Sequence, residues 1–219
     1  MISLVSFLLI IKNLVNFSKK DIDKGKTPPE IYHICSCIRE AFCLSYTIRK
    51  ENNLFLNFQS EGILIKFEGA KLRYLGPDER SQVLLLKKAL DKVNLFKSTD
   101  IEKWRKSTPG IFVRKFSNNQ SVFTYFKSLE FFNPIFLINE NDVEIVNSCF
   151  TVNEFKTLAK ISNFLYIIPA YNLRTEDSNL FQRIKDLKDI KFLTLSKINR
   201  LEDNFLYINF RLDLLKKLN

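Results

Sequence analysis

Residues Lys103–Lys115 read Lys-Trp-Arg-Lys-Ser-Thr-Pro-Gly-Ile-Phe-Val-Arg-Lys. Cations flank a Pro109-Gly110 turn, which follows two hydroxyl residues and precedes an apolar run typical of a strand. Proline fixes φ and glycine permits positive φ, so the turn predicts a rigid backbone that can approach a ligand closely. Lys and Arg around such a turn suit phosphate oxygens, and the hydroxyls add neutral donors. Taken alone, the stretch is more typical of an ordinary loop before a strand.

The composition surrounding this stretch is that of a basic globular protein. The 219 residues are 46% hydrophobic and 26% charged, which is enough for one large α/β domain with a sizeable core. Lys and Arg number 34 against 24 Asp and Glu, for a formal net charge of +10. Such a surplus favours a polyanionic partner, with nucleic acid first and a membrane surface second. A basic surface kept only for solubility would give the same count.

The cysteines predict neither disulfides nor a metal site. Three of the four cysteines cluster at Cys35, Cys37 and Cys43, without a Cys-x-x-Cys pair. His33, Cys35 and Cys37 could suggest a metal cluster, but alternate positions of a helix point to different faces. We therefore expect small core residues in a reducing compartment, and no metal.

The N-terminal run Met1–Ile11 is apolar and resembles a short signal sequence. It lacks leading positive charges and a small-residue cleavage site, and Lys12 interrupts it well short of a membrane span. We therefore interpret it as a buried strand, and expect a cytoplasmic protein with no membrane anchor.

Hydrophobic periodicity predicts an α/β protein with a mostly parallel sheet and helices on both faces. The predicted strands are Val5–Ile11, Leu54–Phe58 and Gly62–Phe67 as a hairpin, a short Lys71–Leu75, Ile111–Phe116, Ile135–Ile138, Phe164–Ile168 and Lys191–Leu195. The predicted helices are Thr27 to about Lys50 with a hydroxyl cap, Asp78–Phe96, Gln120–Leu129, Val152–Lys160, Ser178–Leu187 and Arg200–Lys217, while Asn16–Lys26 is predicted as a polar loop.

Ligands of parallel sheets bind beyond the carboxyl ends of the strands. This rule singles out the residues that follow the last three predicted strands, Asn139–Asp142, Pro169–Leu173 and Ser196–Asn199. No Walker loop or Gly-x-Gly-x-x-Gly turn is present, and a single His gives little support to a His-based nucleophile. Any catalysis is therefore expected to need no metal and no covalent intermediate.

Four motifs stand in the order and spacing of one family. They are Cys37–Arg49, Ile65–Gly69, Leu75–Arg80 with the following Lys87–Leu90, and Trp104–Lys115. The chain resembles the archaeal tRNA pseudouridine-54 N1-methyltransferase family (TrmY), a branch of the SPOUT methyltransferases. The match is strong over residues 31–116 and weak after residue 130.

This resemblance implies a fold and a reaction. The fold would be a SPOUT-type α/β domain over residues 1–219 with a C-terminal trefoil knot. Residues 1–130 would bind RNA, and residues 131–219 would hold S-adenosylmethionine. The chain would act as a homodimer on tRNA and methylate N1 of the pseudouridine at position 54 in the T-loop.

The well-matched motifs imply the RNA-binding and catalytic residues. Asp78 and Arg80 are expected at the pseudouridine, where Asp78 could accept a hydrogen bond from the ring or take its N1 proton. Asp78 could instead simply cap its helix, or do both. The residues expected to bind tRNA or shape its pocket are Arg49, Arg105, Lys106, Ser107, Thr108, Arg114 and Lys115, with Pro109 and Gly110 at the turn. Each single cation could equally be a solvated surface charge.

The cofactor half departs from the family pattern. Where the family has glycines in the loop after a Phe-Ile-Ile strand, this chain has Pro169 and Leu173. Pro169 lacks a backbone N–H, and Leu173 would add bulk where the backbone should approach the ligand. Lys197 replaces a proline of the second loop, and Phe205 replaces a common cysteine. The expected cofactor-binding residues are Leu137, Pro169, Leu193, Thr194, Leu195, Ser196, Lys197, Ile198 and Phe205.

The departures leave two alternatives to tRNA methylation. The chain could be a catalytically inactive RNA-binding protein on the same fold, because both loop glycines are replaced. It could also methylate a pseudouridine of ribosomal RNA, as a related SPOUT branch does.

Overall fold

The computed structural model describes residues 4–117, 119–128, 133–139, 143–144, 146, 148–151, 154, 163–195 and 198–217. In chain order the described elements are β1 (Val5–Ile11), α1 (Lys19–Asp23), α2 (Pro29–Phe42), β2 (Asn52–Phe58), β3 (Ile63–Glu68), η1 (Gly69–Lys71), α3 (Glu79–Asn94), η2 (Ser98–Asp100), β4 (Arg105–Thr108), β5 (Ile111–Lys115), α4 (Asn119–Ser128), β6 (Asn133–Leu137), β7 (Phe164–Pro169), α6 (Leu173–Glu176), α7 (Ser178–Lys185), β8 (Lys191–Leu193) and α8 (Leu201–Lys217). The predicted helix Val152–Lys160 lies almost entirely outside the described residues.

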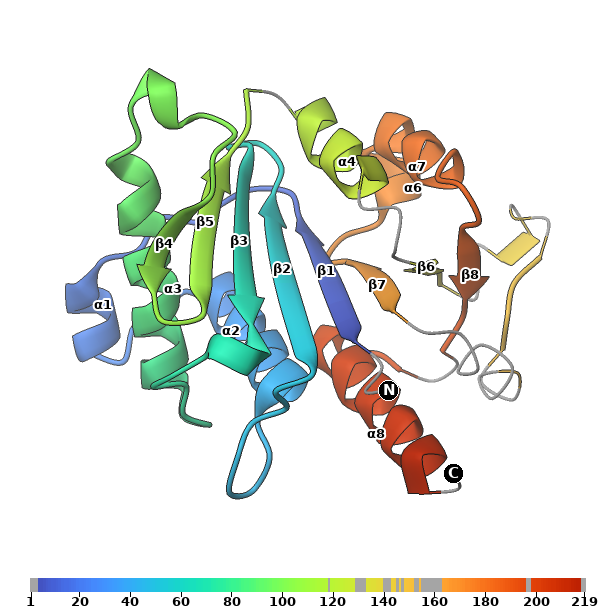
Figure 1. Cartoon of the computed structure of the whole chain (residues 1–219), viewed down its shortest axis with the longest axis horizontal. Coiled ribbons are helices and arrows are strands. Elements are labelled where there is room, and N and C mark those ends of the chain that lie inside the picture. Colours follow the sequence, from blue (N-terminus) through green and yellow to red (C-terminus); the bar gives the residue numbers. More distant parts are fainter. Residues whose placement is uncertain are drawn as a thin grey trace.

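The described strands form one eight-stranded sheet in the order β4-β5-β3-β2-β1-β7-β6-β8 (Figure 1). Strands β2, β1, β7, β6 and β8 run parallel, whereas β3, β5 and β4 are added antiparallel at one edge. The predicted parallel α/β core and the β2–β3 hairpin are confirmed. Since β7 pairs with β1, both halves of the chain contribute to the same sheet.

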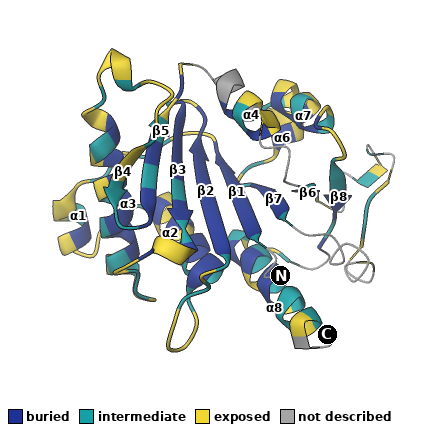
Figure 2. Cartoon of the chain, in the orientation of Figure 1, coloured by how far each residue is buried: buried dark blue, intermediate teal, exposed yellow. Residues whose placement is uncertain are grey.

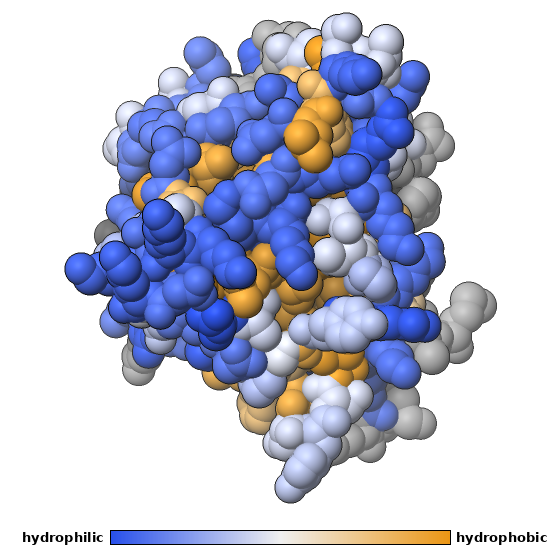
Figure 3. Space-filling view, turned by 90° about the vertical axis from the view of Figure 1, so that its left-hand side faces the viewer, coloured by the Kyte–Doolittle hydropathy of each residue, from blue (hydrophilic) through white to orange (hydrophobic). Residues whose placement is uncertain are grey.

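Helices cover both faces of the sheet, as predicted. One buried cluster joins one face to α2, α3 and α8, and a second joins the opposite face to α4, α6 and α7. β1 and β2 are buried along their whole length, and their side chains fill both clusters (Figure 2). The side of the molecule that carries α1, α3 and β4 is mostly hydrophilic, with apolar residues showing between the polar ones (Figure 3).

Two predictions about helix α2 are wrong. Its N-cap is Pro28, which makes no side-chain cap bond, rather than the hydroxyl of Thr27. The helix ends at Phe42 instead of near Lys50, because Cys43 takes an extended conformation and forms an isolated bridge with Ile48.

Three further segments differ from prediction. The expected loop Asn16–Lys26 contains α1, which starts with a capping box between Ser18 and Asp21. The expected strand Lys71–Leu75 is instead the end of η1 followed by a loop in which Tyr74 has φ +67°. Strand β4 was missed, since its residues are exposed or half-buried and show no apolar alternation.

A buried amide network fastens α8 to the start of β2 and the end of α2. The Asn52 side chain donates to the Ala41 carbonyl at 2.7 Å and to Asn209 Oδ1 at 3.0 Å. Asn209 donates in turn to the Glu40 carbonyl at 2.8 Å. Because these groups are buried and mutually satisfied, they fix how α8 lies across this face of the sheet.

Gly110 makes the β4–β5 turn possible. Its φ is +80°, and a Cβ built there would lie 2.4 Å from the Leu72 nitrogen. The Gly110 carbonyl also accepts a 2.8 Å hydrogen bond from the Glu68 N–H. The turn is therefore packed directly against the loop that follows β3, and only glycine fits.

We expect Gly110→Ala to destabilise the protein more than Gly25→Ala. Both glycines have positive φ, which costs an alanine about 1–2 kcal/mol, but nothing lies within 4 Å of the Cβ built at Gly25. The backbone clash at Gly110 should cost about 1–3 kcal/mol more. Urea unfolding of the two variants measures the difference, and equal losses would show that the Leu72 loop yields without cost.

Candidate functional site

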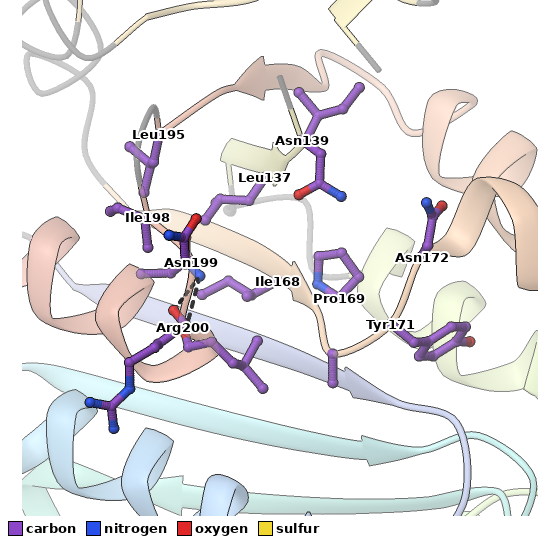
Figure 4. Close-up of a pocket in the computed structure, with 14 residues that line it drawn as sticks. Leu137, Asn139, Ile168, Pro169, Tyr171, Asn172, Leu195, Ile198, Asn199 and Arg200 are labelled. Atoms are coloured by element: carbon purple, nitrogen blue, oxygen red, sulfur yellow. Dashed lines mark hydrogen bonds between the residues drawn. The ribbon is translucent and has the colours of Figure 1, made fainter. Parts of the chain in front are cut away.

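A cavity of about 580 Å³ opens at the carboxyl ends of β6, β7 and β8 (Figure 4). Ile168 and Leu137 lie in its middle, the residues after β7 lie on one side, and the residues between β8 and α8 lie on the other. Its lining residues are Leu137, Ile138, Asn139, Ile168, Pro169, Ala170, Tyr171, Asn172, Leu195, Ile198, Asn199, Arg200, Leu201 and Asn204. This is the position that the parallel-strand rule predicts.

The lining combines apolar side chains with amides and one cation. Asn172 caps α6 by accepting from the backbone N–H groups of Arg174 and Thr175. Asn204 donates to the carbonyls of Arg200 and Leu201, which fixes the start of α8. A pocket of this volume that combines apolar side chains with several polar groups suits an organic ligand of nucleoside size.

A second hollow of about 520 Å³ adjoins the first and shares Ala170, Tyr171 and Asn199–Leu201 with it. It extends to the end of β1 and the first turn of α2. Glu202 lies in its wall and accepts from Arg200 Nε at 2.9 Å. Burial opposes ionisation of Glu202, but hydrogen bonds from its own backbone and from Arg200 outweigh burial and lower the pKa of the carboxyl. Glu202 is therefore ionised at neutral pH, and Arg200, which lines the same hollow, balances its charge.

The structure brings together part of the predicted cofactor-binding set. Leu137, Pro169, Leu195 and Ile198 line the 580 Å³ cavity. Leu193, Thr194 and Phe205 do not line it: Leu193 is buried in β8, and Phe205 packs on Phe7 with ring centroids 5.0 Å apart. Ser196 and Lys197 lie outside the described residues.

Leu173 was predicted to add bulk at the cofactor, but its side chain does not lie in the cavity. It begins α6, and its side chain is buried in the hydrophobic cluster beneath α6 and α7 rather than lining the cavity. Tyr171 turns away to donate its hydroxyl to Gln59. Of the two predicted replacements for glycine, only Pro169 therefore faces the cavity.

The first turn of α8 supplies lining residues that sequence reasoning missed. Leu201 and Asn204 line the cavity, together with Arg200 just before the helix, whose guanidinium points away (Figure 4); the prediction stopped at Asn199. The available signal was the helix start itself, because the first turn of a helix that follows a parallel strand lies at the same edge of the sheet as the strand's end.

Asp78 and Arg80 occupy the turn into α3. Asp78 is the N-cap, and its Oδ1 accepts from the Ser81 N–H at 2.8 Å. The Ser81 hydroxyl and the Gln82 amide both donate to the Gly76 carbonyl, at 3.1 Å each. Arg80 pairs with Asp23 at 2.6 Å. The capping role of Asp78 is thus observed, and its carboxylate remains exposed.

The predicted RNA-binding cations are in different environments. Arg49 makes a two-pronged ion pair with Asp213 of α8, at 2.8 and 2.6 Å, and Arg105 pairs with Asp100. The Arg114 guanidinium lies 4.6 Å from the ring centroids of both Phe116 and Tyr125. Lys106 and Lys115 are exposed, whereas Ser107 and Thr108 are half-buried.

Within one chain, the basic hairpin and the cavity do not meet. β5 and β7 are separated by three strands, which places them about 20 Å apart at ordinary strand spacing. The β4–β5 turn also lies at the end of the sheet where β2 begins, because Ile111, just after the turn, pairs with Phe67, and Phe67 pairs with Leu54 near the start of β2. The cavity lies at the other end, where the parallel strands β6 and β7 end. The two regions are thus at opposite edges and opposite ends of the sheet.

The structure gives no sign of a metal centre or a membrane span in the part that it describes. No three His, Cys, Asp or Glu side chains gather there in a way that could hold a metal ion. Cys35 and Cys37 are buried, and burial raises the pKa of both thiols, while His33 is exposed. Among the described helices, none is long and apolar enough to cross a bilayer.

Comparisons with known proteins match most of the chain. The family model described as "Putative SAM-dependent RNA methyltransferase" matches residues 16–155. The protein named tRNA (pseudouridine(54)-N(1))-methyltransferase of Methanosarcina acetivorans is 40% identical over 102 residues, which cover 45% of this chain and 44% of that protein. The protein of the same name from Methanocaldococcus jannaschii is 31% identical over 117 residues, which cover 52% of this chain and 56% of that protein. The matched part of this chain thus spans about half the length of these curated relatives.

A solved structure is similar to the fold as a whole. The crystal structure of Archaeoglobus fulgidus Nep1 bound to S-adenosylhomocysteine matches with a TM-score of 0.53 and covers 97% of each chain, at 14% sequence identity. At this identity the likeness concerns the fold alone.

The cap and the charge of Asp78 can be separated by two substitutions. We expect Asp78→Ala to lower the free energy of unfolding by about 1 kcal/mol, because the Ser81 N–H loses its acceptor. Asp78→Asn should cost only a few tenths, since asparagine caps helices as well as aspartate does. Thermal unfolding of both variants tests this, and equal destabilisation would mean that the carboxylate charge, not the cap bond, holds the turn.

Proposed function

The chain belongs to the family of SAM-dependent RNA methyltransferases, and on this premise we propose that it methylates N1 of a pseudouridine in tRNA, at position 54 of the T-loop. The proposal extends to this chain what the names of its relatives state for them. S-adenosylmethionine would be the methyl donor.

The observation that carries the proposal is the 580 Å³ cavity at the ends of β6, β7 and β8. Its volume lies in the range of nucleoside-sized ligands. Leu137, Ile168 and Leu195 offer apolar contact to an adenine, and Asn139 and Asn199 offer amides to ribose hydroxyls or to the amino acid end. The Arg200 guanidinium points away from the cavity and donates to Glu202 in the adjoining hollow, so the polar groups offered to the cofactor are mainly amides (Figure 4). The residues present therefore fit the cofactor, although Pro169 stands where the family has glycine.

The bound cofactor would supply an electrophilic methyl group on a sulfonium. The chain's own work would then be to hold the target nitrogen in line with that methyl group and to keep water away. Asp78 is the residue we propose to accept the N1 proton, and Arg80 to bind the base or its phosphate. A general base must come within hydrogen-bond reach of the proton it takes.

The turn that holds Asp78 lies beside the end of α2, since Cys43 Sγ is 3.7 Å from the Gly76 carbonyl, and the end of α2 is bonded to the start of β2. Because the cavity lies where β6 and β7 end, we propose that Asp78 of one copy and the cavity of another meet across a homodimer. The support is an apolar stripe along α8, where Leu206, Phe210 and Leu214 are 50%, 53% and 39% exposed. These residues recur every fourth position and so form one face of the helix. A second copy of the chain would bury this face.

The remaining parts of the proposal follow the family. The N-terminal half, residues 1–130, would bind RNA, and residues 131–219 would form the cofactor region with a trefoil knot. The cytoplasm is the proposed compartment, since the four cysteines are free and suit a reducing environment.

A second candidate function is RNA binding without methyl transfer. The observation that favours it is Pro169, which lines the cavity and has no backbone N–H to offer to a ligand. This candidate predicts RNA retention that does not depend on the cofactor. A third candidate, a pseudouridine of ribosomal RNA as substrate, is separated from the first by offering both RNAs.

We expect the chain to bind S-adenosylhomocysteine in calorimetry. With S-adenosylmethionine and a tRNA whose pseudouridine 54 is not yet methylated, it should form N1-methylpseudouridine, detected by mass spectrometry of the nucleosides. Ala170→Trp should abolish cofactor binding and methyl transfer, because Ala170 lines both hollows and an indole there would occupy the space for a ligand. The matched control, Ala70→Trp, places the same ring on an exposed site of η1 and should leave cofactor binding unchanged. Cofactor binding without product on tRNA or ribosomal RNA, or no binding at all, would remove the enzyme proposal.

We expect the double variant Leu206→Ser, Phe210→Ser to be a monomer in light scattering, whereas the parent chain is a dimer. Both side chains are exposed within one chain, so folding should be unaffected. Leu95→Ser is the control, since Leu95 is 72% exposed at the end of α3. The monomeric variant should still bind cofactor but lose methyl transfer. Full activity in a proven monomer would exclude a site shared between two copies.

A further inference from the structure

The antiparallel edge of the sheet carries an aromatic ring between two lysines. Phe112 of β5 pairs with Lys66 of β3 on one side and with Lys106 of β4 on the other. Directly paired side chains in neighbouring strands stand on the same face of a sheet, about 5 Å apart. Lys66, Phe112 and Lys106 therefore form a row across three strands.

This row stands on the face that α3 does not cover. The neighbours of Phe112 in β5, Ile111 and Val113, are fully buried in the cluster that includes α3. Phe112 points the opposite way, is half-buried, and belongs to neither hydrophobic cluster. Because successive side chains of a strand point to opposite faces, Ile111 and Val113 pack β5 against the α3 side of the sheet, and Phe112 takes no part in that packing.

The cations around the ring exceed the acids. Lys71, which is 62% exposed, lies with its Nζ 5.9 Å from the Phe112 centroid, and Lys66 is 26% exposed. Glu68 contacts both lysines, at 3.2 Å from Lys66 and 2.8 Å from Lys71. Hydrogen bonds from the two lysines outweigh the burial of Glu68 and lower the pKa of its carboxyl. Among the described residues, Glu68 is thus shared by two lysines, and Lys106 adds a third cation to the row.

We propose that this surface, the Phe112 platform (Lys66, Lys71, Lys106 and Phe112), binds an unpaired segment of RNA, with a base stacked on Phe112 and the flanking phosphates at the lysines. The charge of the platform is complementary to a phosphate backbone, and the partly exposed ring of Phe112 offers a base a π-surface once the Lys71 side chain moves toward a phosphate. The proposal rests on the proposed function for the identity of the RNA as substrate. It assigns a binding surface away from both hollows.

An unpaired strand fits the platform better than a duplex. Lys66 and Lys106 are two strands apart, so about 10 Å separates them, with the ring between. A duplex hides the faces of its bases, and would use the lysines without the ring. The dependence of binding on Phe112 therefore distinguishes the two.

The test measures binding of a fluorescent single-stranded RNA decamer and of the same sequence as a duplex, by anisotropy over a range of salt. We expect Phe112→Leu to weaken binding of the single strand about 5- to 100-fold, with little effect on the duplex. Phe112→Tyr should restore binding, because it keeps the ring. The salt dependence should be unchanged in Phe112→Leu, whereas Lys106→Ala should reduce the slope of log K against log salt by about 0.7.

Two further variants sharpen the result. Glu68→Gln should strengthen binding, since it releases Lys66 and Lys71 from their shared acid. Lys88→Ala removes an exposed lysine of α3 and should change nothing beyond a small electrostatic effect. Thermal unfolding checks that each variant is folded.

Unchanged affinity in a folded Phe112→Leu, an equal loss on the duplex, or failure of Phe112→Tyr to restore binding would each overturn the proposal. Cofactor calorimetry on the same variants keeps it separate from the proposed function. A chain that binds single-stranded RNA through Phe112 but never methylates would refute the enzyme alone. A chain that methylates tRNA with Phe112→Leu unaffected would refute the platform alone.

Discussion

The burial of β1 on both faces, between two parallel neighbours, is the constraint on which the arrangement of the molecule depends. β1 pairs with β2 on one side and with β7 on the other, in registers that place Leu9 opposite both Leu56 and Ile168. Strand β2 then leads into the antiparallel hairpins, and β7 leads into the strands that end at the cavity. The register of β1 with its two neighbours therefore places the cavity at one end of the sheet and the basic hairpin at the other. A shift by one residue would move every core side chain of β1 to the opposite face.

This separation divides the chemistry of the chain into two surfaces. The cavity is built from strand ends and from the first turn of α8, and α8 is held in turn by the Asn52–Asn209 network and the Arg49–Asp213 pair. The hairpin surface is built from β3, β4 and β5, with Gly110 packed against Leu72. Arg49 was predicted to bind tRNA phosphates, yet its side chain is paired with Asp213 of α8, the helix whose other end lines the cavity. Within one chain, the hairpin surface and the cavity therefore do not touch; they are connected through the packing of α8 against the sheet.

The sequence was sufficient for the elements that bury a regular apolar pattern and insufficient where the outcome depends on neighbours. β1, the β2–β3 hairpin and the α3 cap at Asp78 were predicted, because continuous apolar runs, turn residues and capping residues are local signals. β4 was missed because a short polar edge strand has no such signal and exists only by pairing with β5. The edge of the cavity was predicted from strand ends, but Leu173 was given the wrong face, since α6 turns its side chain into the core. The spacing of apolar residues along the chain does not determine the order of strands in the sheet, nor the direction in which the side chain of a loop residue points.

Part of the positive charge is neutralised by ion pairs within the chain. A count of +10 suggests a broadly cationic surface, but the structure shows that several of the cations in the matched motifs are already engaged. Arg49, Arg80 and Arg105 each form an ion pair, and Arg114 stacks on two rings. An ion-paired arginine must give up its carboxylate before it can bind a phosphate, so it contributes less to affinity than an exposed lysine does. The same argument applies to Lys66 and Lys71, which share Glu68, so the exposed Lys106 and Lys115 are expected to contribute more to polyanion binding than the paired cations do. A basic net charge is thus compatible with a small number of exposed, unneutralised cations on the described surface.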